Sequence, residues 1–309
     1  MNTKNNKLHK KIFLKFISLI TTVLPLSLSA AIFTGMNFSG MILISAVLMI
    51  YLCKTDTKKI MPVFSAFLIL LYVSQTLGTT SAFVTVFIAG IVSAALLFLP
   101  EQFRTQSSSV TSGFSLATAL TVTVLLTTHY FGIGASGNDV KEMIASYLSL
   151  GFHPNWRGVL YGTIVMVIMI TFPRKFKNFC SVVKAPFIAV VFTLILNFFL
   201  NPSYMITAIN EIGTFAQDTF TPQIALNIFG RIPVHSLAVV MIVGAWESVK
   251  WGEIKKSFSS PVSIICFAIT VISTLYLGYV YGLIISAILY IINNVYHKKL
   301  KSNNSNQSA

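Results

Sequence analysis

The stretch SVTSGFSLATALTVTVLLTTHYF, residues 109–131, contains no Asp, Glu, Lys or Arg. A membrane-spanning helix needs roughly 20 consecutive apolar residues, and this run is long enough. Similar runs recur along the whole chain, in which 55% of the residues are hydrophobic and only 10% are charged. Aqueous domains do not string such runs together, so the sequence predicts an all-α polytopic membrane protein with about ten transmembrane helices. The predicted spans are 13–35, 40–53, 60–78, 81–99, 109–131, 157–172, 182–200, 233–250, 261–276 and 278–296.

The basic residues collect in every second gap between these spans. Because cytoplasmic loops carry an excess of Lys and Arg, this alternation predicts that both termini are cytoplasmic, in the cell (inner or plasma) membrane. Arg157 and Arg231 are the clear exceptions, since both fall on the outer side. The basic residues assigned to the inner side are Lys4, Lys7, Lys10, Lys11, Lys15, Lys54, Lys58, Lys59, Arg104, Arg174, Lys175, Lys177, Lys184, Lys250, Lys255, Lys256, Lys298, Lys299 and Lys301.

The net charge of +14 would suggest nucleic acid as a partner of a soluble protein. Here the basic residues are interpreted as topology signals that contact anionic lipid headgroups. The expected partner is therefore the bilayer, and binding of nucleic acid is not expected. The N-terminal run could alternatively be a cleaved signal peptide, because it ends in small residues. Its apolar part, residues 16–35, is longer than a usual signal core, which favours an uncleaved span.

Two segments do not fit simple spans. Residues 139–153 (DVKEMIASYLSLGFH) have apolar residues at helical spacing, which predicts an interfacial helix on the outer face. Residues 201–232 are polar and punctuated by Pro and Gly, which predicts an external connection or a re-entrant element. The expected parts are a basic N-terminus (1–12), a first bundle (13–200), the connection (201–232), C-terminal spans (233–296) and a disordered cytoplasmic tail (297–309).

No catalytic or metal-binding set is apparent, so the sequence predicts neither an enzyme nor a cofactor. The five histidines are scattered, and the three cysteines have no metal-site or disulfide spacing. Glu247 is the acidic residue best placed near a span, and it is a candidate coupling group. Its alternative is an interfacial ion pair with Lys250 at the cytoplasmic end of the span.

Helix breaks offer a different kind of site. Backbone N–H groups at the start of a helix, together with the positive end of the helix dipole, can bind an anion. Pro62 begins the third span, so Val63, Phe64 and Ser65 would present backbone donors and one hydroxyl. Pro25 breaks the first span, and Ser27 and Ser29 could line a cavity behind it. The alternatives are a simple kink at Pro25 and helix packing by the serines.

These features, in this order, resemble the SulP family of anion transporters. The matching stretches are LPLSLSAAIFTGMNFSGM (24–41), MPVFSAF (61–67), TSGFSLATAL (111–120), VVKAPFIAVVFTLIL (182–196), RIPVHSLAVVMIV (231–243), IKKSFSSPVSIICF (254–267) and LGYVYGLIISAILYI (277–291). The resemblance implies an incomplete seven-plus-seven inverted repeat with broken helices, and an anion bound between the third and tenth family spans. Four family spans, the tenth included, and the cytoplasmic STAS domain have no counterpart. An alternative alignment places AWESVKW on the eighth span, where Glu247 would be a family residue.

The expected function is therefore secondary transport of small inorganic anions of the sulfate, bicarbonate or chloride class. A single helix start supports only weak binding, so a homodimer or a partner chain is an expected way to complete the site. The alternative is a shortened, non-transporting relative that acts as a membrane partner or regulatory subunit.

Overall fold

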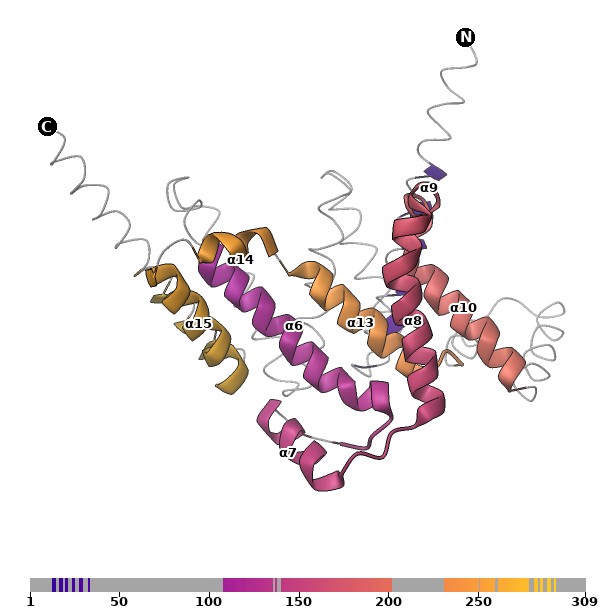
Figure 1. The fold of residues 1–309 in the computed structure, drawn as a ribbon, viewed down its shortest axis with the longest axis horizontal. Helices are drawn as coiled ribbons and strands as arrows, with labels where there is room; N and C mark the ends of the chain where they lie inside the picture. The colour runs from indigo at the N-terminus through magenta and orange to yellow at the C-terminus, as the bar shows by residue number, and fades with distance from the viewer. Residues whose placement is uncertain are drawn as a thin grey trace, which may run out of the picture. The chain divides into compact units, whose positions relative to one another are not determined.

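The computed structural model describes residues 108–135, 137, 140–201, 231–249, 251–258 and 261–277, with single positions between 13 and 33 and between 281 and 292. Within these ranges every regular element is a helix (Figure 1). The helices are α6 (Ser108–Phe131), α7 (Val140–Leu150), α8 (Trp156–Lys175), α9 (Lys177–Cys180), α10 (Ala185–Leu200), α13 (Val234–Ser248), α14 (Trp251–Ser257) and α15 (Pro261–Tyr276).

Two of these helices are long and apolar enough to cross a membrane. They are residues Ser109–Phe131 of α6 and the whole of α8, and α10, α13 and α15 are shorter apolar helices. The five coincide with predicted spans. The predicted interfacial segment 139–153 contains α7, which confirms that it is helical. The predicted spans 13–35, 40–53, 60–78, 81–99 and 278–296 lie wholly or mostly outside the described residues.

Some predicted boundaries were wrong. The span drawn as 182–200 begins only at Ala185, because residues 181–184 form a turn between α9 and α10. The span drawn as 233–250 ends at Ser248, and a separate short helix, α14, follows it. Proline lies at the N-terminal end of both α10 and α15. It suits a helix start, because it lacks the backbone N–H that the first helical turn leaves unbonded.

The chain divides into two compact units. Unit 1 comprises Met1–Leu68, Leu126–Gly134 and Gly151–Gly244, and unit 2 comprises Ile69–Leu125, Ala135–Leu150 and Ala245–Ala309. The described part of unit 1 thus contains the end of α6, all of α8, α9 and α10, and most of α13.

In unit 1, α8 and α10 lie side by side (Figure 1). The buried side of α8 includes Gly158, Tyr161, Gly162, Val165 and Met169, which recur at the three- and four-residue spacing of one helix face. On the other side of α8, Leu160 and Val167 are each 53% exposed. Large apolar side chains exposed along a helix of this length fit a lipid-facing surface.

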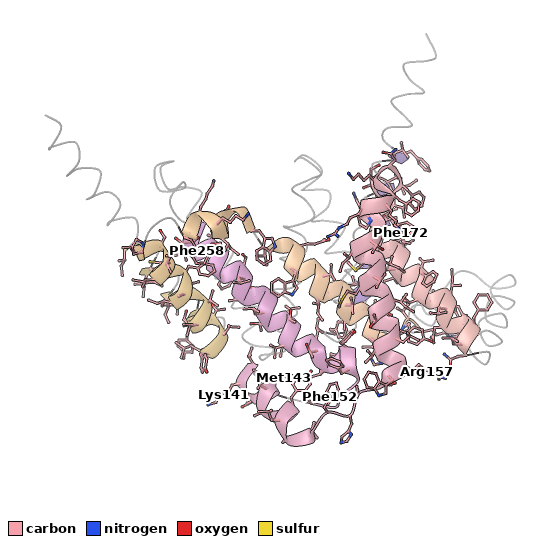
Figure 2. All side chains as sticks on the ribbon, in the orientation of Figure 1. Lys141, Met143, Phe152, Arg157, Phe172 and Phe258 are labelled. Atoms are coloured by element: carbon pink, nitrogen blue, oxygen red, sulfur yellow. The ribbon has the colours of Figure 1, made fainter. Side chains whose placement is uncertain are left out.

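In unit 2, the start of α6 packs against α14 and α15. A side chain at Gly113 would come within 3.0 Å of the carbonyl oxygen of Phe267, so glycine allows α6 and α15 to approach closely. Ser112 and Ser257 share a hydrogen bond of 3.1 Å, which links α6 to α14. Figure 2 labels Met143, the buried residue of α7, and α7 contacts α15.

Candidate functional site

The predicted site residues are only partly within the described chain. Pro25 and Ser29 are both buried, and the Ser29 hydroxyl donates to the carbonyl oxygen of Pro25 at 2.8 Å. This bond uses the hydroxyl proton within the helix, as the packing alternative requires, and leaves the oxygen lone pairs available. Ser27 and residues 62–65 lie outside the described residues, so their assignment stays a prediction.

Glu247 lies in the last turn of α13, where its side chain is exposed. Among the described residues it makes no hydrogen bond or ion pair, and Lys250, its proposed partner, lies outside them. The coupling role and the ion pair therefore both stay predictions.

The first predicted span is tied to the start of α10 through Thr21. The backbone N–H of Lys184 donates to the Thr21 hydroxyl oxygen at 3.3 Å. That oxygen also lies 2.9 Å from the carbonyl oxygen of Ile17 and 3.3 Å from that of Val182. A buried threonine thus satisfies the backbone N–H of Lys184, the N-cap residue of α10, whose own side chain makes no capping hydrogen bond.

Three helix ends meet at His235. The ring nitrogen Nδ1 of His235 lies 2.6 Å from the carbonyl oxygen of His129, in the last turn of α6. The last carbonyls of a helix have no partner within it, so this bond satisfies one of them. Another is satisfied by the backbone N–H of Asn155, which donates to the carbonyl oxygen of Phe131 at 2.8 Å just before α8 begins. The end of α6 and the starts of α8 and α13 therefore lie together.

Two glycines make room for the His235 ring. A side chain at Gly158 would overlap the ring, and one at Gly132 would come within 3.0 Å of it. Gly132 also has a φ of +65°, a conformation that side-chain-bearing residues rarely adopt. Sequence reasoning missed this histidine because its partners are distant along the chain.

A second polar junction lies where α10 ends. The Tyr161 hydroxyl donates to Asn197 Oδ1 at 3.1 Å, and Asn201 Nδ2 donates to the same oxygen at 2.6 Å. Asn197 Nδ2 in turn donates to the carbonyl oxygen of Arg231 at 2.8 Å, just before α13. Tyr161 and Asn197 are buried, and their polar atoms are satisfied by this network, as buried polar groups require.

The start of α13 carries unused donors. The N–H groups of Ser236 and Leu237 bond to the carbonyl oxygen of Pro233, but those of Val234 and His235 have no hydrogen bond among the described residues. The Ser236 hydroxyl is fully buried and also has no partner there. The Cα–Cβ bond of Ser236 tilts toward the start of the helix, where these N–H groups lie.

A sequence signal for this helix start exists. Pro233, Val234, His235 and Ser236 repeat the pattern Pro-Val-x-Ser of residues 62–65, where the sequence predicts the anion site. In the charge-based topology, span 60–78 runs outward and span 233–250 runs inward. The two motifs therefore begin helices that are predicted to run in opposite directions.

The described charged residues near these junctions are basic. Arg157 is exposed in the first turn of α8, four residues before Tyr161, and Arg231 precedes α13. His129, His153 and His235 belong to the same unit, whose described residues include no Asp or Glu.

Comparisons with protein-family models, with curated proteins and with solved structures found no match for this chain. The SulP resemblance accordingly rests on the sequence motifs alone.

Proposed function

We propose that the chain is a secondary transporter of small inorganic anions, resembling SulP carriers, in the cell membrane with both termini cytoplasmic. The observation that carries this proposal is the start of α13, where two backbone N–H groups and the buried Ser236 hydroxyl have no partner among the described residues. An anion accepts hydrogen bonds from all three, and the positive end of the helix dipole adds to its binding.

The two Pro-Val-x-Ser motifs would together supply the pair of helix starts that an inverted-repeat carrier needs. One motif is residues 62–65, and the other is residues 233–236. Pro25 and Ser29 of the broken first span would line the cavity beside the anion, with the Ser29 hydroxyl proton engaged by Pro25, and Glu247 would be the coupling group.

The expected free-energy contributions correspond to weak binding of the anion. Each helix start contributes up to about 2 kcal/mol, and each hydroxyl bond to an anion about 1.5–3 kcal/mol. Ordering the complex and removing water from the anion offset several kcal/mol of this sum. The net of roughly 4 kcal/mol corresponds to millimolar half-saturation, and a monovalent anion is favoured because less charge loses its hydration.

The test is uptake of labelled chloride, bicarbonate and sulfate by the purified chain in liposomes. Uptake should saturate in the millimolar range, and Ser236→Ala should raise the half-saturation concentration about tenfold through loss of one hydrogen bond. Ser65→Ala should act similarly. Ser115→Ala is the matched control, because the Ser115 hydroxyl already donates to the carbonyl oxygen of Ser112 at 2.9 Å.

Absence of uptake for all three anions by folded protein would contradict transport by the chain alone. Uptake that then appears only when a second membrane protein is co-reconstituted would favour the alternative, a shortened relative that acts as a partner or regulatory subunit.

A further inference from the structure

Aromatic side chains gather where α8 passes into α9. The centroid of the Phe172 ring lies 4.7 Å from that of Phe176 and 6.5 Å from that of Phe179. Phe176 and Phe179 are nevertheless 51% and 53% exposed. Figure 2 shows Phe172 near the end of α8 that leads into α9. Two large apolar rings are therefore presented at one end of a predicted span, as in segments that lie in the membrane interface.

Three cations are interleaved with these rings. Arg174 and Lys175 lie in the last turn of α8, Lys177 begins α9, and all three side chains are exposed. Positive charge suits the C-terminal end of α8, where the helix dipole is negative. That interaction accounts for Arg174 and Lys175, but it does not account for the exposed rings beside them.

Carboxylates that could neutralise this corner are scarce in the sequence. Glu142 and Glu211 are the nearest acidic residues along the chain on either side of it. In the charge-based topology Glu211 falls in the external connection, and Asp56 is the only acidic residue on the inner side of unit 1. Asp56 itself stands between Lys54 and Lys58. The sequence on the inner side of this unit is therefore predominantly basic.

The ring contacts also hold the corner together. The backbone N–H of Phe176 donates to the carbonyl oxygen of Phe172 at 2.9 Å, and that of Cys180 donates to the carbonyl oxygen of Phe176 at 2.9 Å. The Phe172–Phe179 contact joins the end of α8 to α9. Together these contacts keep α9, which carries Lys177, next to the last turn of α8.

We propose that this corner, formed by Phe172, Arg174–Lys177 and Phe179, binds the headgroup of an anionic phospholipid in the inner leaflet. The exposed rings lie at the boundary between headgroups and acyl chains, and the cations contact the lipid phosphate. The occupant is a lipid rather than free phosphate, because an inorganic anion would leave the rings in water. The site is local, whereas topology signalling depends on the total Lys and Arg content of the inner loops.

Bromine-labelled lipids report which lipid lies beside a tryptophan. The chain has three tryptophans, so Trp156→Phe, Trp246→Phe and Trp251→Phe combined with Phe176→Trp leave emission from position 176 alone. This parent chain is placed in nanodiscs of phosphatidylcholine and anionic phosphatidylglycerol, with bromine on one lipid or the other. The dependence of quenching on lipid fraction gives the relative binding constant. Phosphatidylglycerol should be favoured about fivefold, which corresponds to one cation fully engaged at the surface.

Charge variants of the parent chain test the cations. Arg174→Gln with Lys175→Gln and Lys177→Gln should bring the relative binding constant to about one. Arg174→Lys keeps the charge and should retain the preference. Lys255→Gln with Lys256→Gln is the matched control, because it removes two cations from α14, which is also predicted to lie on the inner side. This control should leave the preference unchanged.

Phe172→Ala tests the aromatic contacts, since it removes no charge but frees α9 from the end of α8. It should lower the preference to between fivefold and one. Equal quenching by the two lipids in the parent chain would overturn the proposal. An equal loss of preference in the α14 control would also overturn it, and would mean that lipids respond to the total charge of the inner face.

Replacing chloride by inorganic phosphate at equal ionic strength should leave the preference unchanged. Loss of the preference under these conditions would overturn the assignment to lipid and would favour free phosphate. The quenching experiment measures no uptake, so its outcome is independent of whether the chain transports anions.

Discussion

His235 shows how one side chain can fix three helix ends. Its ring bonds to the carbonyl of His129 and fills the space that Gly132 and Gly158 leave open. The sequence alone could not reveal this, because more than a hundred residues separate the two histidines. The roles of the two glycines could not be predicted either, since a packing glycine and a turn glycine look the same in a single sequence.

Gly158→Ala should destabilise the folded protein by roughly 1–3 kcal/mol, because the added methyl group displaces the His235 ring. The measurement is thermal unfolding in detergent. In the double variant with His235→Ala the two effects should not add, since the methyl group then enters vacated space. Gly134→Ala is the control, because nothing lies within 4 Å of a side chain there. Strict additivity would show that the ring does not occupy this space.

Asn197→Ala should cost roughly 2–4 kcal/mol of unfolding free energy, because it removes the side-chain partner of the Tyr161 hydroxyl and of the Arg231 carbonyl, while the Asn201 amide keeps its bond to the backbone carbonyl of residue 197. Asn201→Ala should cost less than about 1 kcal/mol, since Asn197 keeps its bonds to Tyr161 and Arg231. Thermal unfolding of the two variants in the same detergent gives the comparison. Equal losses would contradict the central position of Asn197.

At the scale of elements, apolar periodicity predicted helices well and helix interruptions poorly. The runs 109–131 and 261–276 correspond closely to α6 and α15, because neither contains a charge or an internal Pro. The break after Ser248 was missed, since Val249 continues the apolar pattern. There the Trp246 and Trp251 rings stack with centroids 5.9 Å apart, and Trp246 Nε1 donates to the Thr123 hydroxyl. These contacts depend on tertiary packing.

From the sequence, only the type of candidate site could be predicted. A helix start opened by proline was the expected anion-binding element, and α13 is such a start. The predicted start at Pro62 lies outside the described residues, and the start of α13 was not predicted because the sequence does not say which donors find partners. That depends on Pro233 accepting from Ser236 and Leu237, and on what surrounds the Ser236 hydroxyl.

The short helix α9 offers a test of the predicted inner face. Burial raises the pKa of the Cys180 thiol, and Lys184 lowers it in part. A raised pKa means less thiolate at neutral pH, so alkylation should be slow at pH 7 and faster as the pH rises. In a chain with Cys53→Ser and Cys266→Ser, an impermeant maleimide should react only from the cytoplasmic side.

A chain with Ser181→Cys and Cys180→Ser provides the matched control, because residue 181 is exposed and its thiol should react faster from the same side. Labelling of Cys180 from outside the cell would reverse the predicted orientation of α8 and α10.

At the scale of the whole molecule, Asn197 constrains the path of the connection between α10 and α13. Asn197 bonds to both Asn201 and the Arg231 carbonyl, so the connection leaves and returns at the same point. A chain that returns to the same face crosses the membrane an even number of times. Two crossings need about 40 apolar residues and a turn, and fewer than thirty residues lie between these ends. Residues 202–230 lie outside the described part of the chain, and we expect them to be an external or a re-entrant segment, as the sequence predicts.

The nearness of Asn201 and Arg231 predicts on which side of the membrane the connection lies. In a chain with all three native cysteines replaced by serine, Thr214→Cys and Ser136→Cys should both react with an impermeant maleimide added outside the cell, because both precede a span predicted to run inward. Ser181→Cys should react only after the membrane is opened. A Thr214→Cys thiol that is labelled solely from the cytoplasmic side would mean that the segment crosses once. The ends of α10 and α13 would then lie on opposite faces, and the hydrogen bonds of Asn197 to both ends could not form.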